Sequence, residues 1–221
     1  MLYLKDIVYH PTASPAPILN HISLELPPEQ MGLIIGRSGS GKTTLLEILA
    51  GLAERTSGEI LWREQVLTPE HLQQLGGLVF QFPERHFCGS SLLEELRLGH
   101  PELTHSQLSQ ALAEVGLEQL PLDTAPYALS GGQQRRLALA VQLIRQPHLL
   151  MLDEPTAGLD WSMRRQLVSL LAKLKTHWTL LVVTHDASDL IGLADRCWTL
   201  DQGNLQKVDA EQLKQMKCVS A

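Results

Sequence analysis

The chain has few aromatic residues and an acidic rather than a basic balance of charge. Phenylalanine, tryptophan and tyrosine together make up 5% of its 221 residues. Lysine and arginine number 18 against 24 aspartates and glutamates, so the formal charge is -6 at pH 7. Because proteins that bind the nucleic-acid backbone need a surplus of basic side chains, we expect no nucleic-acid partner.

Long hydrophobic runs are also missing. No stretch approaches the roughly 20 apolar residues that a membrane-spanning helix needs. The N-terminal sequence MLYLKDIVYHP lacks the basic and apolar regions of a signal peptide. We therefore expect any association with a membrane to come through a partner protein.

Cysteine is scarce as well. Cys88, Cys197 and Cys218 are odd in number and far apart, and no two form the CxxC pair of zinc sites and redox motifs. This usage predicts buried or incidental thiols in a reducing, cytosolic compartment.

The apolar content is nevertheless sufficient for a core. Hydrophobic residues make up 44% of the chain and charged residues 19%, which is typical of a folded protein. Because hydrophobic cores stop growing at about 250 to 300 residues, one compact domain over residues 1–221 is expected.

The N-terminal part reads as strands. Alternation and turn residues predict strands at Leu2–Tyr9, Ile22–Leu26 and Gly32–Ile35, which we expect to form a small β layer. A Gly/Ser loop and a helix follow the last of them. Further strands are predicted at Glu59–Trp62 and Leu78–Phe82, and helices at Ser91–Leu98, Ser106–Val115 and Gln133–Arg145.

Strands and helices then alternate. The pattern predicts strands at His148–Leu152 and Thr179–Val183, with a helix at Met163–Lys175 between them and a short helix from Ala187. This alternation builds a parallel sheet, so the fold class is expected to be α/β.

A phosphate-binding loop lies between a strand and a helix. Residues 36–43 match GxxxxGK[ST] at every fixed position. Glycines allow backbone N–H groups to converge on phosphate at a helix N-terminus, where Lys42 adds charge and the Thr43 hydroxyl can ligate magnesium. We expect a nucleoside triphosphate to bind here. The candidate binding residues are Gly36, Arg37, Ser38, Gly39, Ser40, Gly41, Lys42, Thr43 and Thr44.

Two carboxylates follow an apolar strand. Asp153 and Glu154 come after the run Leu149–Leu152, so they are expected at the carboxyl edge of the sheet, where ligands bind. There Asp153 can reach a magnesium ion and Glu154 can orient or deprotonate water. A single histidine after a strand is usually structural, but this topology aims His185 at the γ-phosphate.

The sequence LSGGQ at residues 129–133 precedes a helix and, alone, could be an ordinary helix cap with Ser130 as N-cap. Together with the loop at 36–43 and LLMLDEP at 149–155, it resembles the ATP-binding cassette of ABC transporters. The resemblance adds Gln81 as the lid glutamine, residues 157–160 as the D-loop and His185 as the switch histidine.

The resemblance implies a fold and a site. The fold would be an α/β P-loop NTPase (RecA-like) core with an antiparallel β subdomain and a helical insertion subdomain at about residues 84–146, all in a single ABC ATPase domain. ATP and Mg²⁺ are the implied cofactors. The implied catalytic residues are Glu154, His185, Gln81 and Lys42, and the implied metal ligands are Thr43, Gln81 and Asp153.

The resemblance also implies partners. Two cassettes would pair head to tail as a homodimer or heterodimer, with each ATP between the phosphate loop of one chain and the signature of the other. The dimer would dock on transmembrane permease subunits at the cytoplasmic face of the inner or plasma membrane and hydrolyse ATP to move a solute. The residues assigned to the second chain's ATP are Ser130, Gly131, Gly132, Gln133 and Asp160.

A narrower likeness favours uptake. Residues 79–85, VFQFPER, resemble the lid segment of energy-coupling-factor and cobalt-type importer ATPases and of single-cassette proteins of cyanobacteria and plastids. Two alternatives stay open. A soluble ABC ATPase could act as a conformational clamp without moving a solute, and a small-molecule kinase could use the phosphate loop, although LSGGQ would then have no role.

Two aromatic features are open to interpretation. The adenine-stacking aromatic of the family is expected near Pro11, so Tyr9 either stacks on the base or belongs to the core. Phenylalanine occurs only at positions 80, 82 and 87, around the lid glutamine. From this clustering we expect Phe87 to be an exposed anchor that contacts the membrane partner together with Phe82 and Glu84.

Overall fold

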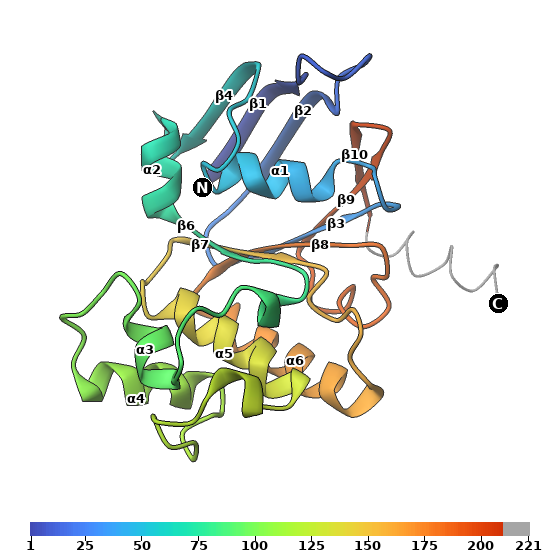
Figure 1. The fold of residues 1–221 in the computed structure, drawn as a ribbon. Helices are drawn as coiled ribbons and strands as arrows, with labels where there is room; N and C mark the ends of the chain where they lie inside the picture. Colours follow the sequence, from blue (N-terminus) through green and yellow to red (C-terminus); the bar gives the residue numbers. More distant parts are fainter. Residues whose placement is uncertain (210–221) are drawn as a thin grey trace.

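The computed structural model describes residues 1–209, apart from the side chain of Glu84. Within these residues the strands form two sheets. Helix α1 (Lys42–Leu49) packs between the sheets, and helices α3 to α6 cover the opposite face of the second sheet (Figure 1). This layering confirms the expected α/β fold with an antiparallel β part.

The first sheet is antiparallel and has the order β2-β1-β4-β5. Strand β2, at one edge of this sheet, largely alternates buried and exposed side chains, as a sheet with one solvated face requires. Its strands are β1 (Leu2–Tyr9), β2 (Leu19–Leu26), β4 (Ser57–Trp62) and β5 (Gln65–Val66).

The second sheet has the order β10-β9-β3-β8-β7-β6 and is parallel except for β10. Strands β3, β8 and β7 are neighbours, so the loops at their carboxyl ends meet. The strands are β3 (Met31–Ile35), β6 (Gly76–Val79), β7 (Leu149–Asp153), β8 (Thr179–Thr184), β9 (Arg196–Asp201) and β10 (Asn204–Val208).

The central strands separate two hydrophobic cores. Along β7, Leu149 and Met151 face the core under the first sheet, whereas Leu150 and Leu152 face the core under the helices. Because successive side chains point to opposite faces, a strand buried on both faces must be apolar throughout. Every residue of β7 and β8 is buried.

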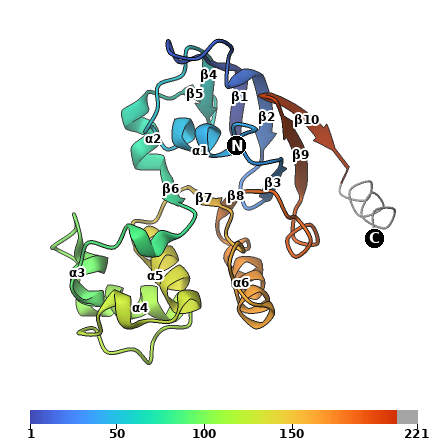
Figure 2. The same ribbon diagram turned by 45° about the vertical axis from the view of Figure 1, so that its right-hand side comes forward.

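The helices of the opposite face begin at polar caps. Ser91, Thr104 and Ser130 each accept a hydrogen bond from the third residue of the helix that follows. The chain between β6 and β7 carries η1, α3, α4, η2 and α5, which gather beside α6 (Figure 2). Their bounds are η1 (Pro83–Arg85), α3 (Leu92–Arg97), α4 (His105–Glu114), η2 (Pro126–Ala128), α5 (Gly131–Leu143) and α6 (Trp161–Leu174).

Three expectations about elements are wrong. The strand at Met31–Ile35 belongs to the second sheet, not to the N-terminal β layer. Strand β6 ends at Val79, and Phe82, with a left-handed φ of 57°, lies beyond it outside the sheet. The segment from Ala187 forms turns rather than a helix, and Gly192 disfavours its extension. Helix α2 (Pro69–Leu75) and strands β5, β9 and β10 were not expected.

Two further expectations concern single features. Cys197 is buried and Cys88 is exposed, while Cys218 lies outside the described residues. No helix formed by residues 1–209 is long and apolar enough to cross a membrane.

Candidate nucleotide site

The phosphate loop connects β3 to α1. Strand β3 pairs with β8 up to Ile35 and Thr184, and the N–H of Gly36 donates to the carbonyl of Thr184 at 3.1 Å. The loop then turns, with the N–H of Ser40 donating to the carbonyl of Arg37 at 3.2 Å. Residues Arg37, Ser38 and Gly39 are exposed. The loop is thus anchored at its ends and open to solvent in its middle.

The loop has the features of an anion cradle. Gly41 caps α1 with a φ of 102° and no side-chain cap, so the first N–H groups of the helix lack intrahelical acceptors. A Cβ at Gly36 would lie 2.3 Å from the carbonyl oxygen of Leu200, so this position accepts only glycine. Within residues 1–209 the buried Ser40 hydroxyl has no hydrogen-bond partner. Unpaired donors at a helix N-terminus are suited to phosphate oxygens.

The Lys42 ammonium lies over the loop and is buried. It donates to the carbonyls of Gly36 at 2.8 Å and Arg37 at 3.0 Å, and it lies 3.5 Å from Oε1 of Glu154. A buried ammonium is costly unless it is paired and hydrogen-bonded. These partners occupy it in the absence of an anion.

Asp153 ends β7 beside the first turn of α1. Its Oδ2 accepts a hydrogen bond from the Thr43 hydroxyl at 2.6 Å. Burial raises the pKa of the Asp153 carboxyl above its ordinary value, and the charge of Glu154 adds to this, against the opposing effects of the Thr43 hydrogen bond and Lys42. A cation placed here would relieve that unfavourable charge.

Glu154 follows Asp153 and turns toward the end of β8. Its Oε2 accepts from the Thr184 hydroxyl at 2.8 Å and lies 2.8 Å from Nδ1 of His185. Its Oε1 accepts from the N–H of His185 at 2.9 Å. The carboxylate is buried, whereas the His185 side chain is 56% exposed. The histidine can therefore reach a ligand while it contacts the carboxylate.

The structure thus brings Lys42, Thr43, Asp153, Glu154 and His185 together at the carboxyl edge of the second sheet. Neighbouring strand ends account for this grouping, since Asp153 pairs with Val183 in the sheet. Half-buried Gln81 follows β6 at the same edge. Across the described residues, its side chain makes no hydrogen bond to the group.

The signature residues 130–133 are separate from this group. Ser130 and Gln133 form a reciprocal capping box, with Ser130 N donating to Gln133 Oε1 at 2.9 Å and Gln133 N to Ser130 Oγ at 3.3 Å. Asp160 caps α6 by accepting from the N–H of Met163 at 2.9 Å. In residues 1–209 no hydrogen bond joins these residues to the phosphate loop. Within one chain, they are helix caps.

The interpretation of Phe87 as an exposed anchor is wrong. Phe87 is half-buried and packs against the core under the helices. Phe82 is also half-buried, with the Arg85 guanidinium 5.0 Å from its ring centre, and Phe80 stacks on His86. The side chain of Glu84 lies outside what the structure describes. The three phenylalanines thus have packing contacts within the chain, and the expected contact of Phe82, Glu84 and Phe87 with a membrane partner stays a prediction.

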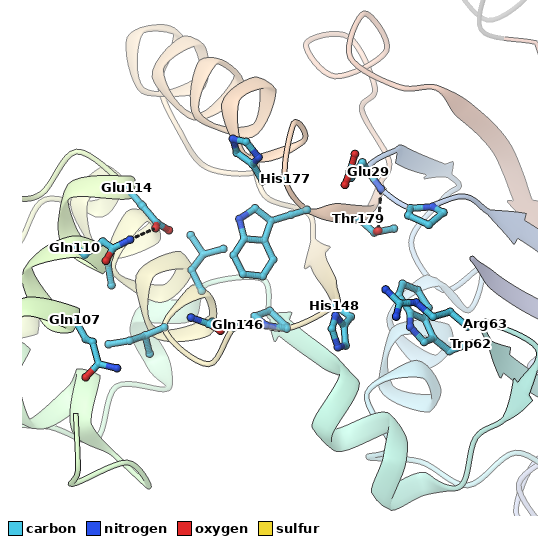
Figure 3. A pocket seen from close by; sticks show the side chains of 16 residues that line it. Glu29, Trp62, Arg63, Gln107, Gln110, Glu114, Gln146, His148, His177 and Thr179 are labelled. Atoms are coloured by element: carbon cyan, nitrogen blue, oxygen red, sulfur yellow. Dashed lines mark hydrogen bonds between the residues drawn. The ribbon is translucent and has the colours of Figure 1, made fainter. Parts of the chain in front are cut away.

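Tyr9 lies at the end of β1, half-buried against the core under the first sheet. This contact agrees with the core alternative for Tyr9. A cavity of about 380 Å³ is lined by Trp62, His148 and Trp178 among others. Figure 3 shows the side chains around it, with Trp62 and His148 labelled. The cavity opens at the amino ends of β7 and β8, so it holds none of the expected site residues.

Two arginines near the site were not expected. Arg135 of α5 donates to backbone carbonyls of the segment that begins with Glu154. Arg164 of α6 donates to the carbonyl of Leu159 at 2.9 Å and lies 3.5 Å from Asp189. The sequence shows arginines on these helices, but only the packing reveals that Arg135 is buried and Arg164 half-buried at these contacts.

Comparison with known proteins agrees with this geometry. A family model for "ABC transporter" matches residues 19–157. The chain is 44% identical to ABC transporter I family member 11, chloroplastic, from Arabidopsis thaliana, over 91% of this chain and 78% of that protein. It is 36% identical to the energy-coupling factor transporter ATP-binding protein EcfA2 of Lactiplantibacillus plantarum, over 91% of this chain and 74% of that protein.

A solved structure is similar over its whole length. CbiO1 from Clostridium perfringens, part of the ABC transporter complex CbiONQ, superposes with a TM-score of 0.89 at 25% identity, covering 99% of this chain and 92% of that one. The arrangement of both sheets and the helices is therefore shared with a cassette ATPase.

Proposed function

The chain belongs to the ABC transporter family, and on that premise we propose that it is the ATP-binding and ATP-hydrolysing subunit of a membrane transporter. It pairs with a second cassette and docks on transmembrane permease subunits at the cytoplasmic face of the membrane. Dimer closure driven by ATP is coupled to solute movement, in the direction of uptake. The likeness to an energy-coupling factor ATPase supports that direction.

The observation that carries the proposal is the position of Glu154. Its carboxylate lies 3.5 Å from the phosphate-loop Lys42 and 2.8 Å from His185. A carboxylate beside a phosphate cradle can orient water and take up its proton. A kinase would need an acceptor alcohol there instead, and it would leave the signature at 130–133 without a role.

The phosphate loop holds the triphosphate. Backbone N–H groups at the start of α1 and the Ser40 hydroxyl donate to phosphate oxygens. Lys42 exchanges its bonds to the carbonyls of Gly36 and Arg37 for bonds to phosphate. The remaining loop residues and Thr44 complete the cradle. Binding therefore replaces internal hydrogen bonds of the loop rather than adding an uncompensated charge.

The residues at the carboxyl edge fit a magnesium ion. Thr43 and Asp153 place a hydroxyl and a carboxylate oxygen 2.6 Å apart, and burial raises the pKa of that carboxyl. Oxygen ligands of this kind, together with phosphates, are typical of magnesium sites, and Gln81 is a third ligand in this proposal. Magnesium, when bound, neutralises charge on the phosphate oxygens.

Catalysis then rests on four side chains. Glu154 orients the water and accepts its proton, and Gln81 helps to position it. Lys42 and His185 stabilise the charge that develops on the γ-phosphate. His185 carries this out from the end of β8, where its backbone N–H is bound to Glu154.

The second chain completes each site. The start of α5 presents exposed Ser130 and Gly131, and half-buried Gly132 and Gln133, to the γ-phosphate bound by the partner cassette. Exposed Asp160 lies at the same interface. A Cβ at Gly131 would meet no atom within 4 Å, which leaves space for a ligand. The helix N-terminus there favours an anion.

Phosphate release from ATP in the absence of any acceptor tests the reaction class. The parent protein should release phosphate, and Lys42→Ala should lower turnover by about 10²-fold or more, as expected for removal of a transition-state charge partner. Lys5→Ala, which changes an exposed lysine of β1, is the matched control and should leave turnover unchanged. Phosphate transfer only when an alcohol is added would show a kinase instead.

Purification from detergent-solubilised membranes tests the transporter assignment. The tagged chain should co-purify with integral membrane proteins in a fixed ratio. Recovery only as a soluble cassette dimer, with normal ATP hydrolysis, would favour the conformational clamp.

A further inference from the structure

A buried arginine of α5 holds the backbone that follows β7. Arg135 is 5% exposed. Its Nη1 donates to the carbonyl oxygens of Glu154 at 3.3 Å and Ala157 at 3.1 Å, and also to that of Pro155. One guanidinium group therefore binds three carbonyls within four consecutive residues. Hydrogen bonds from a charged donor are stronger than neutral ones, and these form in a buried environment.

The backbone held in this way has an unusual conformation. Glu154 has a φ of 47°, in the left-handed region that non-glycine residues rarely adopt. Such a conformation persists only when the surroundings enforce it. It takes the chain off the line of β7 and turns the Glu154 carboxylate to the end of β8, where Thr184 and His185 bind it. The direction of the carboxylate thus depends on the peptide units that Arg135 binds.

A second contact joins the same elements. Gly132, near the start of α5, packs on Met163 of α6, where an added Cβ would lie 2.7 Å from the sulfur. Met163 in turn is bound by the cap of Asp160. The segment from Glu154 to Asp160 is therefore held against α5 at its beginning by Arg135 and near its end by this packing.

We propose that Arg135 is a positioning residue for ATP hydrolysis, which holds the backbone of residues 154–157 so that the Glu154 carboxylate faces the phosphate loop. Arg135 also ties the direction of that carboxylate to helix α5. The inference rests on the proposed function, because it requires Glu154 to act on water during hydrolysis. All three carbonyls accept from the same guanidinium nitrogen, Nη1. A lysine ammonium ends one bond nearer the backbone and lacks the rigid planar group that places this nitrogen.

Two substitutions and a matched control test the role. Arg135→Met keeps the length of the side chain and removes the donors, and Arg135→Lys keeps one charged donor group. We expect kcat to fall about tenfold or more in Arg135→Met and less in Arg135→Lys, with the Kd for ATP within twofold of the parent. Arg145→Met is the control, since Arg145 is exposed and its side chain, among residues 1–209, donates only to the carbonyl of Leu98 at 3.3 Å. It should leave kcat unchanged.

A double-mutant cycle separates positioning from general stabilisation. If Arg135 acts through Glu154, then Arg135→Met should have little further effect on the residual turnover of Glu154→Gln. An equal loss in both backgrounds, or an unchanged kcat in Arg135→Met, would overturn the inference. If Arg135→Met does not fold, Arg135→Lys decides, because an unchanged kcat there would also overturn it.

Phosphate release by the parent protein distinguishes a failure of this inference from a failure of the proposed function. A parent that releases no phosphate would refute the proposed function and the inference with it. A parent that hydrolyses ATP normally, with Arg135 variants that do the same, would refute the inference alone.

Discussion

Replacement of Glu154 by glutamine has two opposite effects on stability. A buried hydrogen bond is lost, and a charge that raises the pKa of Asp153 is removed. Oε2 accepts from Thr184 and His185, whereas Oε1 accepts from the His185 N–H at 2.9 Å and lies 3.5 Å from Lys42. The glutamine oxygen can replace Oε2, which has more donors around it. Its NH₂ group then points at two other donors in place of Oε1. The ligand-free protein is therefore expected to lose stability.

The size of that loss follows from one buried hydrogen bond replaced by opposed donors, about 1–3 kcal/mol. Loss of the Glu154 charge also removes one cause of the raised pKa of Asp153. We therefore expect the net loss of stability to lie toward the lower end of this range. At about 2–4 °C per kcal/mol for a domain of this size, Tm should fall by about 2–12 °C. Turnover should fall by about 10²-fold or more, as expected for loss of a general base.

Three measurements check the reasoning on one preparation. Calorimetry without nucleotide gives Tm, phosphate release gives turnover, and gel filtration with ATP and magnesium should show an accumulated dimer. Glu114→Gln, the same change at an exposed carboxylate of α4, should alter none of them. A Glu154→Gln protein that hydrolyses ATP at the parent rate would refute the assignment of the base.

Two further predictions concern the same site. Because burial raises the pKa of Asp153 in the folded state, the folded protein binds more protons than the unfolded chain between the ordinary and the raised pKa, so stability falls as pH rises through that interval. Asp153→Asn should remove this fall, so the Tm of the variant in metal-free buffer should rise relative to that of the parent as pH increases. A Tm difference between the two proteins that does not change with pH would contradict the prediction. Mixing Lys42→Ala with Ser130→Arg chains should restore part of the ATPase activity, because each heterodimer keeps one composite site free of both changes. If mass spectrometry confirms the heterodimers and no activity returns, the result would count against composite sites.

Most elements of the second sheet could be predicted from the chain alone. The apolar run at Leu149–Leu152 is typical of a strand buried on both faces, and the structure extends it by one residue to Asp153. Helices α4 and α5 begin within two residues of their expected starts, because Thr104 and Ser130 supply capping side chains. Strong local signals of this kind survive in any tertiary context.

Elements with weak local signals were missed or misplaced. Strand β9 contains polar residues and is a strand because it pairs with β3. The expected strand through Phe82 stops at Val79, since the chain there leaves the sheet in a left-handed turn. Pairing partners and turns of this kind depend on distant residues, which no local pattern records.

The sequence by itself determined the chemistry of the site, because a phosphate loop, an acidic pair after an apolar strand and a histidine after the next strand each carry their own local signal. Only the tertiary structure decided how these groups meet. The neighbouring positions of β3, β8 and β7 place the Glu154 carboxylate within ion-pair distance of Lys42 and within hydrogen-bonding distance of His185. The buried Arg135 is the clearest example of a contact that the sequence does not reveal. The contact depends on which face of α5 packs against residues 154–157, and long-range packing sets that face rather than spacing along the chain.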